Sequence, residues 1–246
     1  MLATQTEQTK QTEQVEKPEQ VKEEVNSVEF DNYIINDEIT KYNSFDEIGL
    51  KDNILRGIYG YGFEHPSPIQ KLAIKPMIEG RDMITQSHSG TGKTGTFVIG
   101  ILSNIDESIN GTQAIVIAPT RELANQIYSV YQNLSKYTKI TGCLCIGGTL
   151  QNRYNYNKLN TEHIIVGTPG RVSDLINRGV IKSDNIKMVV IDEADDVLSS
   201  SFRKQVQKIF DAAPKTAQMC LFSATIPDEI FELTEELLNK PLKILV

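Results

Sequence analysis

The chain has 246 residues, of which 39% are hydrophobic and 23% are charged. This composition can fill the core of one large domain or two small ones, and no apolar run approaches the roughly 20 residues needed to cross a bilayer. The first residues lack a basic-then-apolar signal, and three cysteines in apolar runs argue against a disulfide framework. We expect a monomeric cytoplasmic protein without membrane partners; a nuclear location is the alternative.

The net charge of −7 is concentrated near the N-terminus. Residues 1–44 contain four lysines and ten acidic residues, which leaves 21 positive and 22 negative charges for residues 45–246. The larger part of the chain is therefore almost neutral. It lacks the basic excess that would indicate nucleic-acid binding from composition alone.

Residues 1–43 are predicted to form a disordered acidic tail rich in Gln and Glu. The first 29 residues contain no aromatic side chain, so they can bury too little apolar surface to offset the entropy lost on ordering. The alternative is a docking arm for a partner, with Phe30, Tyr33, Ile34 and Ile35 as a short hydrophobic anchor.

Residues 44–246 have the pattern of an α/β domain. Short apolar runs, typical of strands buried on both faces, occur at 83–85, 114–118, 144–146, 164–166, 188–191, 219–222 and 244–246. Helical spacing connects Leu123, Ile127, Val130 and Leu134, and it also connects Leu198, Phe202, Val206 and Ile209. This alternation predicts a mostly parallel sheet sandwiched by helices, with ligands beyond the carboxyl ends of the strands.

A glycine-rich segment follows the first of these runs. Gly90-Thr91-Gly92-Lys93-Thr94 fits a phosphate-binding loop in which backbone N–H groups cradle phosphates, Lys93 reaches the β and γ phosphates, and the Thr94 hydroxyl binds Mg²⁺. The general pattern has Gly where this chain has Ser87. A plain glycine-rich turn is the alternative. The predicted nucleotide contacts are Ser87, His88, Ser89, Gly90, Thr91, Gly92, Lys93 and Thr94.

An acidic segment follows the run at 188–191. Asp192 is the candidate for the second protein contact of Mg²⁺, and Glu193 is the candidate for orienting or deprotonating the attacking water. Asp195 could connect this loop to its neighbours. The alternative is a solvated helix N-terminus, where acidic residues are favoured by the helix dipole. We predict Lys93, Asp192 and Glu193 as the catalytic residues.

Asp192-Glu193-Ala194-Asp195 resembles the signature of the DEAD-box RNA helicases, and other blocks of that family's first domain occur in the same order. They are Gly62–Gln70 with Phe45 seventeen residues upstream of Gly62, Pro119–Gln126, Gly147–Gly148, Thr168–Arg171 and Ser223–Thr225. Residues 55–63 are most similar to the initiation-factor 4A group of the family. The resemblance implies a RecA-like ATP-binding domain over 44–246, the N-terminal half of an ATP-dependent RNA helicase, with ATP and Mg²⁺ as cofactors.

The resemblance also implies an adenine site. The Gln70 amide carries donors and an acceptor and could read the adenine edge, while the Phe45 ring could stack on the base. The alternatives are a turn-capping amide for Gln70 and a core aromatic for Phe45.

The RNA contacts implied by the resemblance come from backbone N–H groups and hydroxyls of Thr120, Gly148, Thr168 and Gly170, with charge from Arg121 and Arg171. Phosphate and sugar contacts carry no base information, so RNA binding should be independent of sequence. The alternative for each arginine is a structural ion pair. Ser223 and Thr225 would couple the ATP and RNA sides through hydroxyl hydrogen bonds to Asp195; ordinary turn hydrogen bonds are the alternative.

Members of the family have a second domain that supplies arginine fingers, and here the sequence given stops at the run 244–246. We therefore expect this chain alone to bind ATP but to hydrolyse it slowly, since an arginine finger contributes about 10³–10⁵ in rate. A scaffold protein of the initiation-factor type is an expected partner. The alternatives are a non-catalytic ATP- or scaffold-binding module and another phosphate-loop ATPase such as a DNA helicase.

Overall fold

A computed structural model describes residues 28–30, 33–148, 159–199 and 202–245. Within these residues nine strands form one sheet, in the order β1-β2-β9-β3-β8-β7-β4-β6-β5. The strands from β9 to β5 are parallel, as the alternating pattern predicts. They are β1 Val28–Phe30, β2 Tyr33–Ile35, β3 Met83–Gln86, β4 Ala114–Ile117, β5 Gly142–Cys145, β6 Ile164–Gly167, β7 Met188–Asp192, β8 Gln218–Ser223 and β9 Leu242–Leu245.

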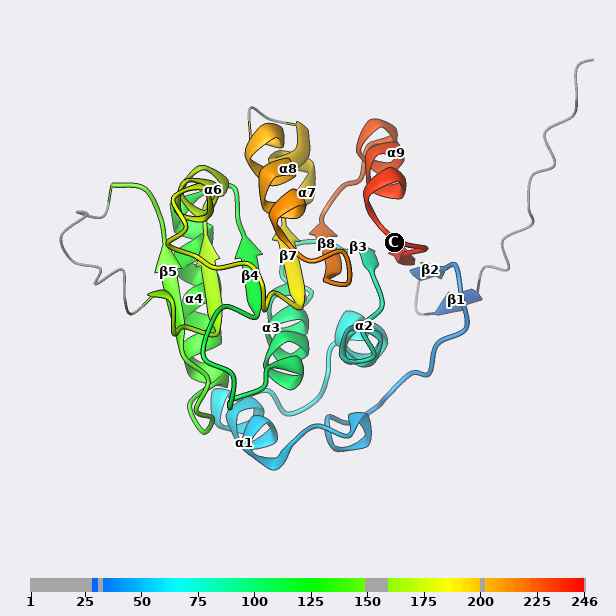
Figure 1. The fold of residues 1–246 in the computed structure, drawn as a ribbon. Coiled ribbons are helices and arrows are strands. Elements are labelled where there is room, and N and C mark those ends of the chain that lie inside the picture. The colour runs from blue at the N-terminus through cyan, green and yellow to red at the C-terminus, as the bar shows by residue number, and fades with distance from the viewer. Residues whose placement is uncertain (1–27, 31–32, 149–158, 200–201, 246) are drawn as a thin grey trace, which may run out of the picture.

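Helices cover both faces of the sheet, with α1 to α4 on one side and α6 to α9 on the other (Figure 1). Each layer encloses its own hydrophobic core, because successive strand residues point to opposite faces: Ala114 and Val116 enter one core, and Ile115 and Ile117 the other. The helices are α1 Asp52–Tyr61, α2 Pro68–Ile78, α3 Lys93–Asn104, α4 Arg121–Leu134, α6 Pro169–Asn177, α7 Ala194–Ser199, α8 Arg203–Ala212 and α9 Asp228–Leu237, with a 3₁₀ turn at Asp46–Ile48.

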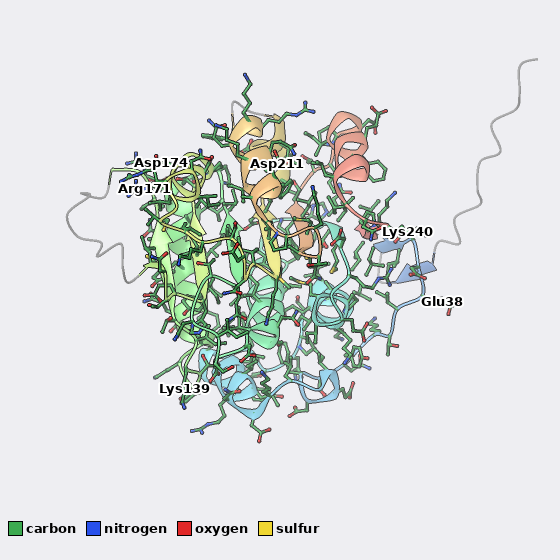
Figure 2. All side chains as sticks on the ribbon, viewed as in Figure 1. Glu38, Lys139, Arg171, Asp174, Asp211 and Lys240 are labelled. Atoms are coloured by element: carbon green, nitrogen blue, oxygen red, sulfur yellow. The ribbon has the colours of Figure 1, made fainter. Side chains whose placement is uncertain are left out.

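Charged side chains lie around the outside of these layers. Glu38, Lys139, Asp211 and Lys240, labelled in Figure 2, are all exposed. No helix in the part of the chain that the structure describes is long and apolar enough to cross a bilayer.

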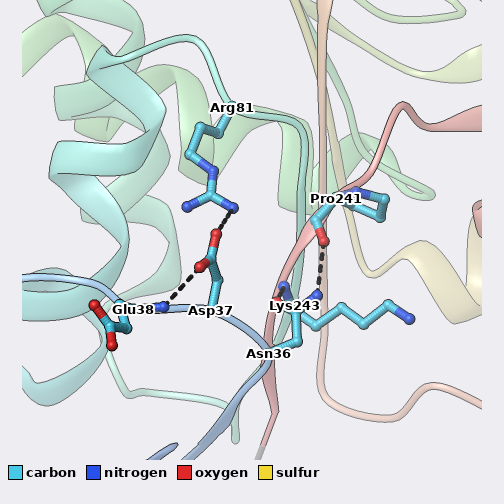
Figure 3. A network of polar contacts seen from close by, with 6 residues as sticks. All are labelled: Asn36, Asp37, Glu38, Arg81, Pro241 and Lys243. Carbon is cyan, nitrogen blue, oxygen red and sulfur yellow. Dashed lines mark hydrogen bonds and ion pairs between the residues drawn. The ribbon is translucent and has the colours of Figure 1, made fainter. Parts of the chain in front are cut away.

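The expectation of a disordered tail over 1–43 is wrong for its last part, because β1 and β2 belong to the sheet. Strand β2 pairs antiparallel with β9, and Ile35, opposite Ile244, is fully buried. Asn36 extends this pairing through its side chain, which accepts from the Lys243 N–H at 2.7 Å and donates to the Pro241 carbonyl at 3.1 Å (Figure 3). Burial of the Ile35 side chain offsets the entropy that this segment loses on ordering. The polar residues before it could not provide this stabilisation. Residues 1–27 lie outside the described residues.

The second predicted helical face is divided between two helices. Leu198 lies in α7, whereas Phe202 is the N-cap residue of α8, which contains Val206 and Ile209. Both helices pack on the same hydrophobic core. The helical spacing of the apolar residues therefore reflects their burial against this core and does not indicate one continuous helix.

Candidate functional site

The segments predicted to carry function follow the carboxyl ends of neighbouring parallel strands. The phosphate loop follows β3, Thr225 follows β8, Glu193 follows β7, Thr120 follows β4, Thr168 follows β6 and Gly148 follows β5. Because these strands are parallel, the segments meet at one edge of the sheet. The predicted nucleotide residues occupy one half of this edge and the predicted RNA residues occupy the other.

The phosphate loop turns at two glycines in the left-handed region, Gly90 with φ 83° and Gly92 with φ 103°. Only glycine adopts this backbone without strain. Lys93 begins α3 and is buried, and its Nζ donates to the carbonyl of Ser87 at 2.6 Å and to that of His88 at 3.5 Å. The ammonium group is therefore held over the loop, where a phosphate could replace a carbonyl as its acceptor.

Ser87, which replaces the glycine of the general pattern, is accommodated inside the loop. It is fully buried, and its Oγ lies 2.5 Å from Oγ1 of Thr91, which donates to the His88 carbonyl at 2.8 Å. His88, Ser89 and Gly90 are exposed, so their side of the loop is open to a ligand. Thr94 is partly buried in the first turn of α3.

Gln70 connects α2 to the phosphate loop. Its Oε1 accepts from the Ser67 N–H at 2.9 Å and completes a capping box, while its Nε2 donates to the Gly92 carbonyl at 3.3 Å. Gln70 thus has the helix-capping role considered as its alternative, and its amide also lies directly beside the phosphate loop. A Cβ on Gly95 would come within 2.7 Å of Gln70 Nε2 and 2.9 Å of the Phe63 ring, so glycine is required for this close approach.

Phe45 lies in the hydrophobic core, which is the alternative considered for it. None of its surface is exposed, and its ring meets that of Tyr59 edge-on with centroids 6.3 Å apart. Stacking on a base would require this ring to become exposed, so that role stays a prediction.

The carboxyl group of Asp192 is almost completely buried at the end of β7. Burial raises its pKa to about 7, with a further contribution from the Glu193 carboxylate, while the Lys93 ammonium acts in the opposite direction. Glu193 has a φ of +49°, which costs a residue with a Cβ about 1–3 kcal/mol. Strain of this kind at a strand tip beside a buried carboxyl is typical of functional sites.

A divalent cation fits these residues. The Asp192 carboxylate and the Thr94 hydroxyl are oxygen donors of the type that Mg²⁺ prefers. A cation beside Asp192 would favour the ionised carboxylate and so reverse the effect of burial on its pKa.

Asp195 is held by the segment after β8. It accepts hydrogen bonds from Oγ of Ser223 at 2.6 Å and from the hydroxyl of Thr225. Burial acts to raise the pKa of Asp195, but these hydroxyl hydrogen bonds, together with hydrogen bonds from the backbone of Asp195 and Asp196, leave the pKa below its ordinary value. The hydrogen bonds are those expected from the sequence; their role in coupling stays a prediction.

On the other half of the edge, Thr120 and Arg121 begin α4. The Thr120 hydroxyl accepts from the Leu123 N–H at 3.2 Å, so it caps the helix. The guanidinium of Arg121 lies against Gly147 and Gly148, where a Cβ on Gly148 would come within 2.8 Å of it. Gly148 has a φ of +79° and is exposed.

Thr168, Gly170 and Arg171 form the N-terminal end of α6. In the part of the chain that the structure describes, the Thr168 hydroxyl makes no capping hydrogen bond, and a Cβ on Gly170 would meet no atom within 4 Å beyond its chain neighbours and its own helix backbone. Arg171 forms the ion pair considered as its alternative, with Nη1 3.1 Å from Oδ2 of Asp174 (Figure 2).

Two residues at this edge were missed from the sequence. Gly95 lies one residue beyond the phosphate-loop motif, and only the packing of α2 on α3 identifies it. Asp174 lies three residues after Arg171, a spacing that brings side chains together on a helix and was a usable signal.

Comparisons with known proteins identify the family of the chain. A family model described as DEAD/DEAH box helicase matches residues 67–233. The chain is 51% identical over 203 residues to "ATP-dependent RNA helicase eIF4A" of Yarrowia lipolytica, and 49% identical over 206 residues to "Eukaryotic initiation factor 4A" of Drosophila melanogaster. These alignments cover 82% and 83% of the chain and 51% of each relative. The chain therefore spans about half the length of the curated relatives it matches.

Solved structures show the same fold. A DEAD box protein from Methanococcus jannaschii matches with a TM-score of 0.78 and 36% identity, over 83% of this chain and 56% of that one. A structure titled "S. cerevisiae Dbp5 bound to RNA and ADP BeF3" matches with a TM-score of 0.78 and 36% identity, over 83% of this chain and 52% of that one. With its RecA-like parallel sheet and its ordered motifs along one edge, the chain belongs to the DEAD/DEAH box helicase family.

Proposed function

We propose that this chain binds ATP–Mg²⁺ and the backbone of single-stranded RNA, as the nucleotide-binding half of an ATP-dependent RNA helicase of the initiation-factor 4A type. The observation that carries the proposal is the convergence at one sheet edge of Lys93, in the phosphate loop after β3, and the buried Asp192 carboxyl, at the end of β7. Neither arrangement is needed for the stability of an α/β sheet.

The residues divide the work according to their chemistry. Lys93 exchanges the Ser87 carbonyl for a phosphate oxygen, and the loop N–H groups hold the remaining phosphate oxygens. Gln70 turns its amide from the Gly92 carbonyl towards the adenine edge. Thr94 and Asp192 hold Mg²⁺, which when bound neutralises charge developing on the phosphates. Glu193 orients the attacking water and accepts its proton.

RNA binds the other half of the edge through phosphates and sugars. The open space at Gly170 and the exposed Gly148 leave room for a backbone to approach closely, and such contacts carry no base information. A relative of similar structure is titled as bound to RNA. Asp195, held by the Ser223 and Thr225 hydroxyls, couples the two halves.

Turnover by these residues alone is slow. The chain spans about half the length of its relatives, and phosphoryl transfer needs cationic groups around the transition state, where an arginine finger contributes about 10³–10⁵ in rate. We place the protein in the cytoplasm with an initiation-factor scaffold as partner, in keeping with relatives named as initiation factors.

Glu193→Gln separates binding from catalysis. The amide keeps the shape of the side chain but cannot accept a proton, so we expect ATP–Mg²⁺ affinity within about twofold of wild type and hydrolysis lower by about 10²-fold or more. Titration calorimetry measures the first quantity, and single-turnover release of labelled phosphate measures the second.

Lys93→Ala is the matched control, since it should lose ATP binding itself. Absence of binding heat for the wild-type chain would overturn the ATP site. Unchanged phosphate release by Glu193→Gln would instead favour a non-catalytic module.

A further inference from the structure

Arg171 occupies an electrostatically unfavourable position in α6. It is the third residue of this nine-residue helix, and the positive end of the helix dipole lies there. Asp174, one turn later, provides the opposing charge: its Oδ2 lies 3.1 Å from Nη1 of Arg171 and 3.5 Å from Nη1 of Arg178. One carboxylate is thus shared by two arginines.

The two arginines differ in exposure. The Arg171 side chain is only 15% exposed, whereas those of Arg178 and Asp174 are 45% and 47% exposed. The contact of Asp174 with Arg171 is shorter than that with Arg178, and the Arg171 side chain is the more buried of the two arginines. Both observations indicate that Asp174 pairs mainly with Arg171 in the free chain. Arg178 lies on the solvent side and can keep Asp174 neutralised when Arg171 leaves.

The position in front of α6 is open to an anion. Among the described residues, a Cβ built on Gly170 would meet no atom within 4 Å apart from its chain neighbours and the backbone of its own helix, and the Thr168 hydroxyl makes no capping hydrogen bond. A phosphate placed there would need the same guanidinium that Asp174 now occupies.

We propose that Asp174 is an internal competitor of the RNA backbone: it binds Arg171 in the free chain and gives it up to a phosphate, remaining paired with Arg178. This inference rests on the proposed RNA binding and adds a regulator of that site. Asp174 is a positioning residue that acts through Arg171. It lowers RNA affinity and keeps Arg171 ordered while RNA is absent.

The test is Asp174→Asn in the whole chain, with fluorescence anisotropy of a labelled oligouridylate in low salt. Exposed ion pairs contribute little, so we expect RNA to bind about two- to fivefold more tightly. Arg171→Gln should weaken binding, and the gain from Asp174→Asn should disappear in the Arg171→Gln background. Thermal unfolding confirms that each variant is folded.

Glu122→Gln is the matched control for charge alone, because it removes an exposed carboxylate in the first turn of the neighbouring α4. The gain from Asp174→Asn must exceed that of Glu122→Gln. Weaker RNA binding by Asp174→Asn, or a gain that persists with Arg171→Gln, overturns the competitor role while RNA binding itself stands. If the wild-type chain fails to bind the oligonucleotide, the proposed RNA site fails, and this inference fails with it.

Discussion

Gly95 is the residue that allows the Gln70 amide to lie against the phosphate loop. It belongs to α3, where glycine costs helix stability relative to alanine, yet a Cβ there would come within 2.7 Å of Gln70 Nε2 and 2.9 Å of the Phe63 ring. Glycine at this position thus lowers the helix propensity of α3, but it allows Gln70 to approach the phosphate loop closely. A hydrogen atom at this position keeps the proposed adenine reader and the phosphate loop together.

Gly95→Ala should therefore destabilise the chain and disturb base selection. Overpacking a tight contact costs about 1–3 kcal/mol, and the Cβ must displace Gln70 or Phe63. We expect the urea midpoint to fall by an amount in this range, and the preference for ATP over GTP measured by calorimetry to shrink.

Gly60→Ala is the control, because Gly60 also lies in a helix and its Cβ would meet only Tyr137 at an ordinary 3.5 Å. That variant should be neutral or slightly more stable. Equal effects of the two substitutions would contradict the packing explanation.

At the scale of elements, the hairpin of β1 and β2 joins the sheet through few contacts. Strand β2 has three residues, and the Asn36 side chain adds two hydrogen bonds to the segment around β9 (Figure 3). Arg81 adds an ion pair with Asp37 at 2.7 Å. The apolar residues of β2 were recognised only as a possible anchor for a partner, because they follow a polar segment and their partner strand lies about 200 residues away.

Asn36→Ala should weaken this attachment. It removes two side-chain hydrogen bonds and leaves the Lys243 N–H without its acceptor, so the free energy of unfolding should fall by about 1–3 kcal/mol. Urea denaturation measures the change, and hydrogen exchange should show faster exchange in β2 and β9.

Asn43→Ala is the comparison, since the exposed Asn43 side chain accepts only a long contact from Lys71 at 3.5 Å. Its effect should be within about 0.5 kcal/mol. An Asn36→Ala variant as stable as wild type would contradict the stabilising role assigned to the Asn36 side chain.

Across the whole molecule, strand order sets the arrangement of the site. Strands β3 and β7 lead into the predicted nucleotide residues, β8 between them leads into the predicted coupling residues Ser223 and Thr225, and β4, β6 and β5 lead into the predicted RNA residues. The sheet and these loops were predictable because strands buried on both faces give continuous apolar runs and the loops follow them directly. The burial of Phe45 and the division of α7 from α8 were not, because tertiary packing decides them.

Binding of ATP–Mg²⁺ should stabilise the whole fold. A ligand at 100 times its Kd adds about 2.7 kcal/mol, and in a domain of this size each kcal/mol raises Tm by about 2–4 °C. We expect a rise of about 5–10 °C in scanning calorimetry. Removing Mg²⁺ with EDTA should abolish most of it, because Asp192 would then face the phosphates without a cation.

Lys93→Ala serves as the control, since it should show no rise under either condition. A full shift in the presence of EDTA would contradict the metal role assigned to Thr94 and Asp192.

The position of β9 also bears on how the chain acquires its structure during synthesis. Strand β9, the last described strand, lies between β2 and β3. Strands β2 and β3 are synthesised early, but they can join this part of the sheet only after β9 has been synthesised. During translation, β3 would leave the ribosome with both edges unpaired, because its neighbours β8 and β9 are made later, and β2 would have no strand of the sheet to join. Pairing at this side would then be a late step, in which β9 joins the earlier β2 to β3 and the rest of the sheet.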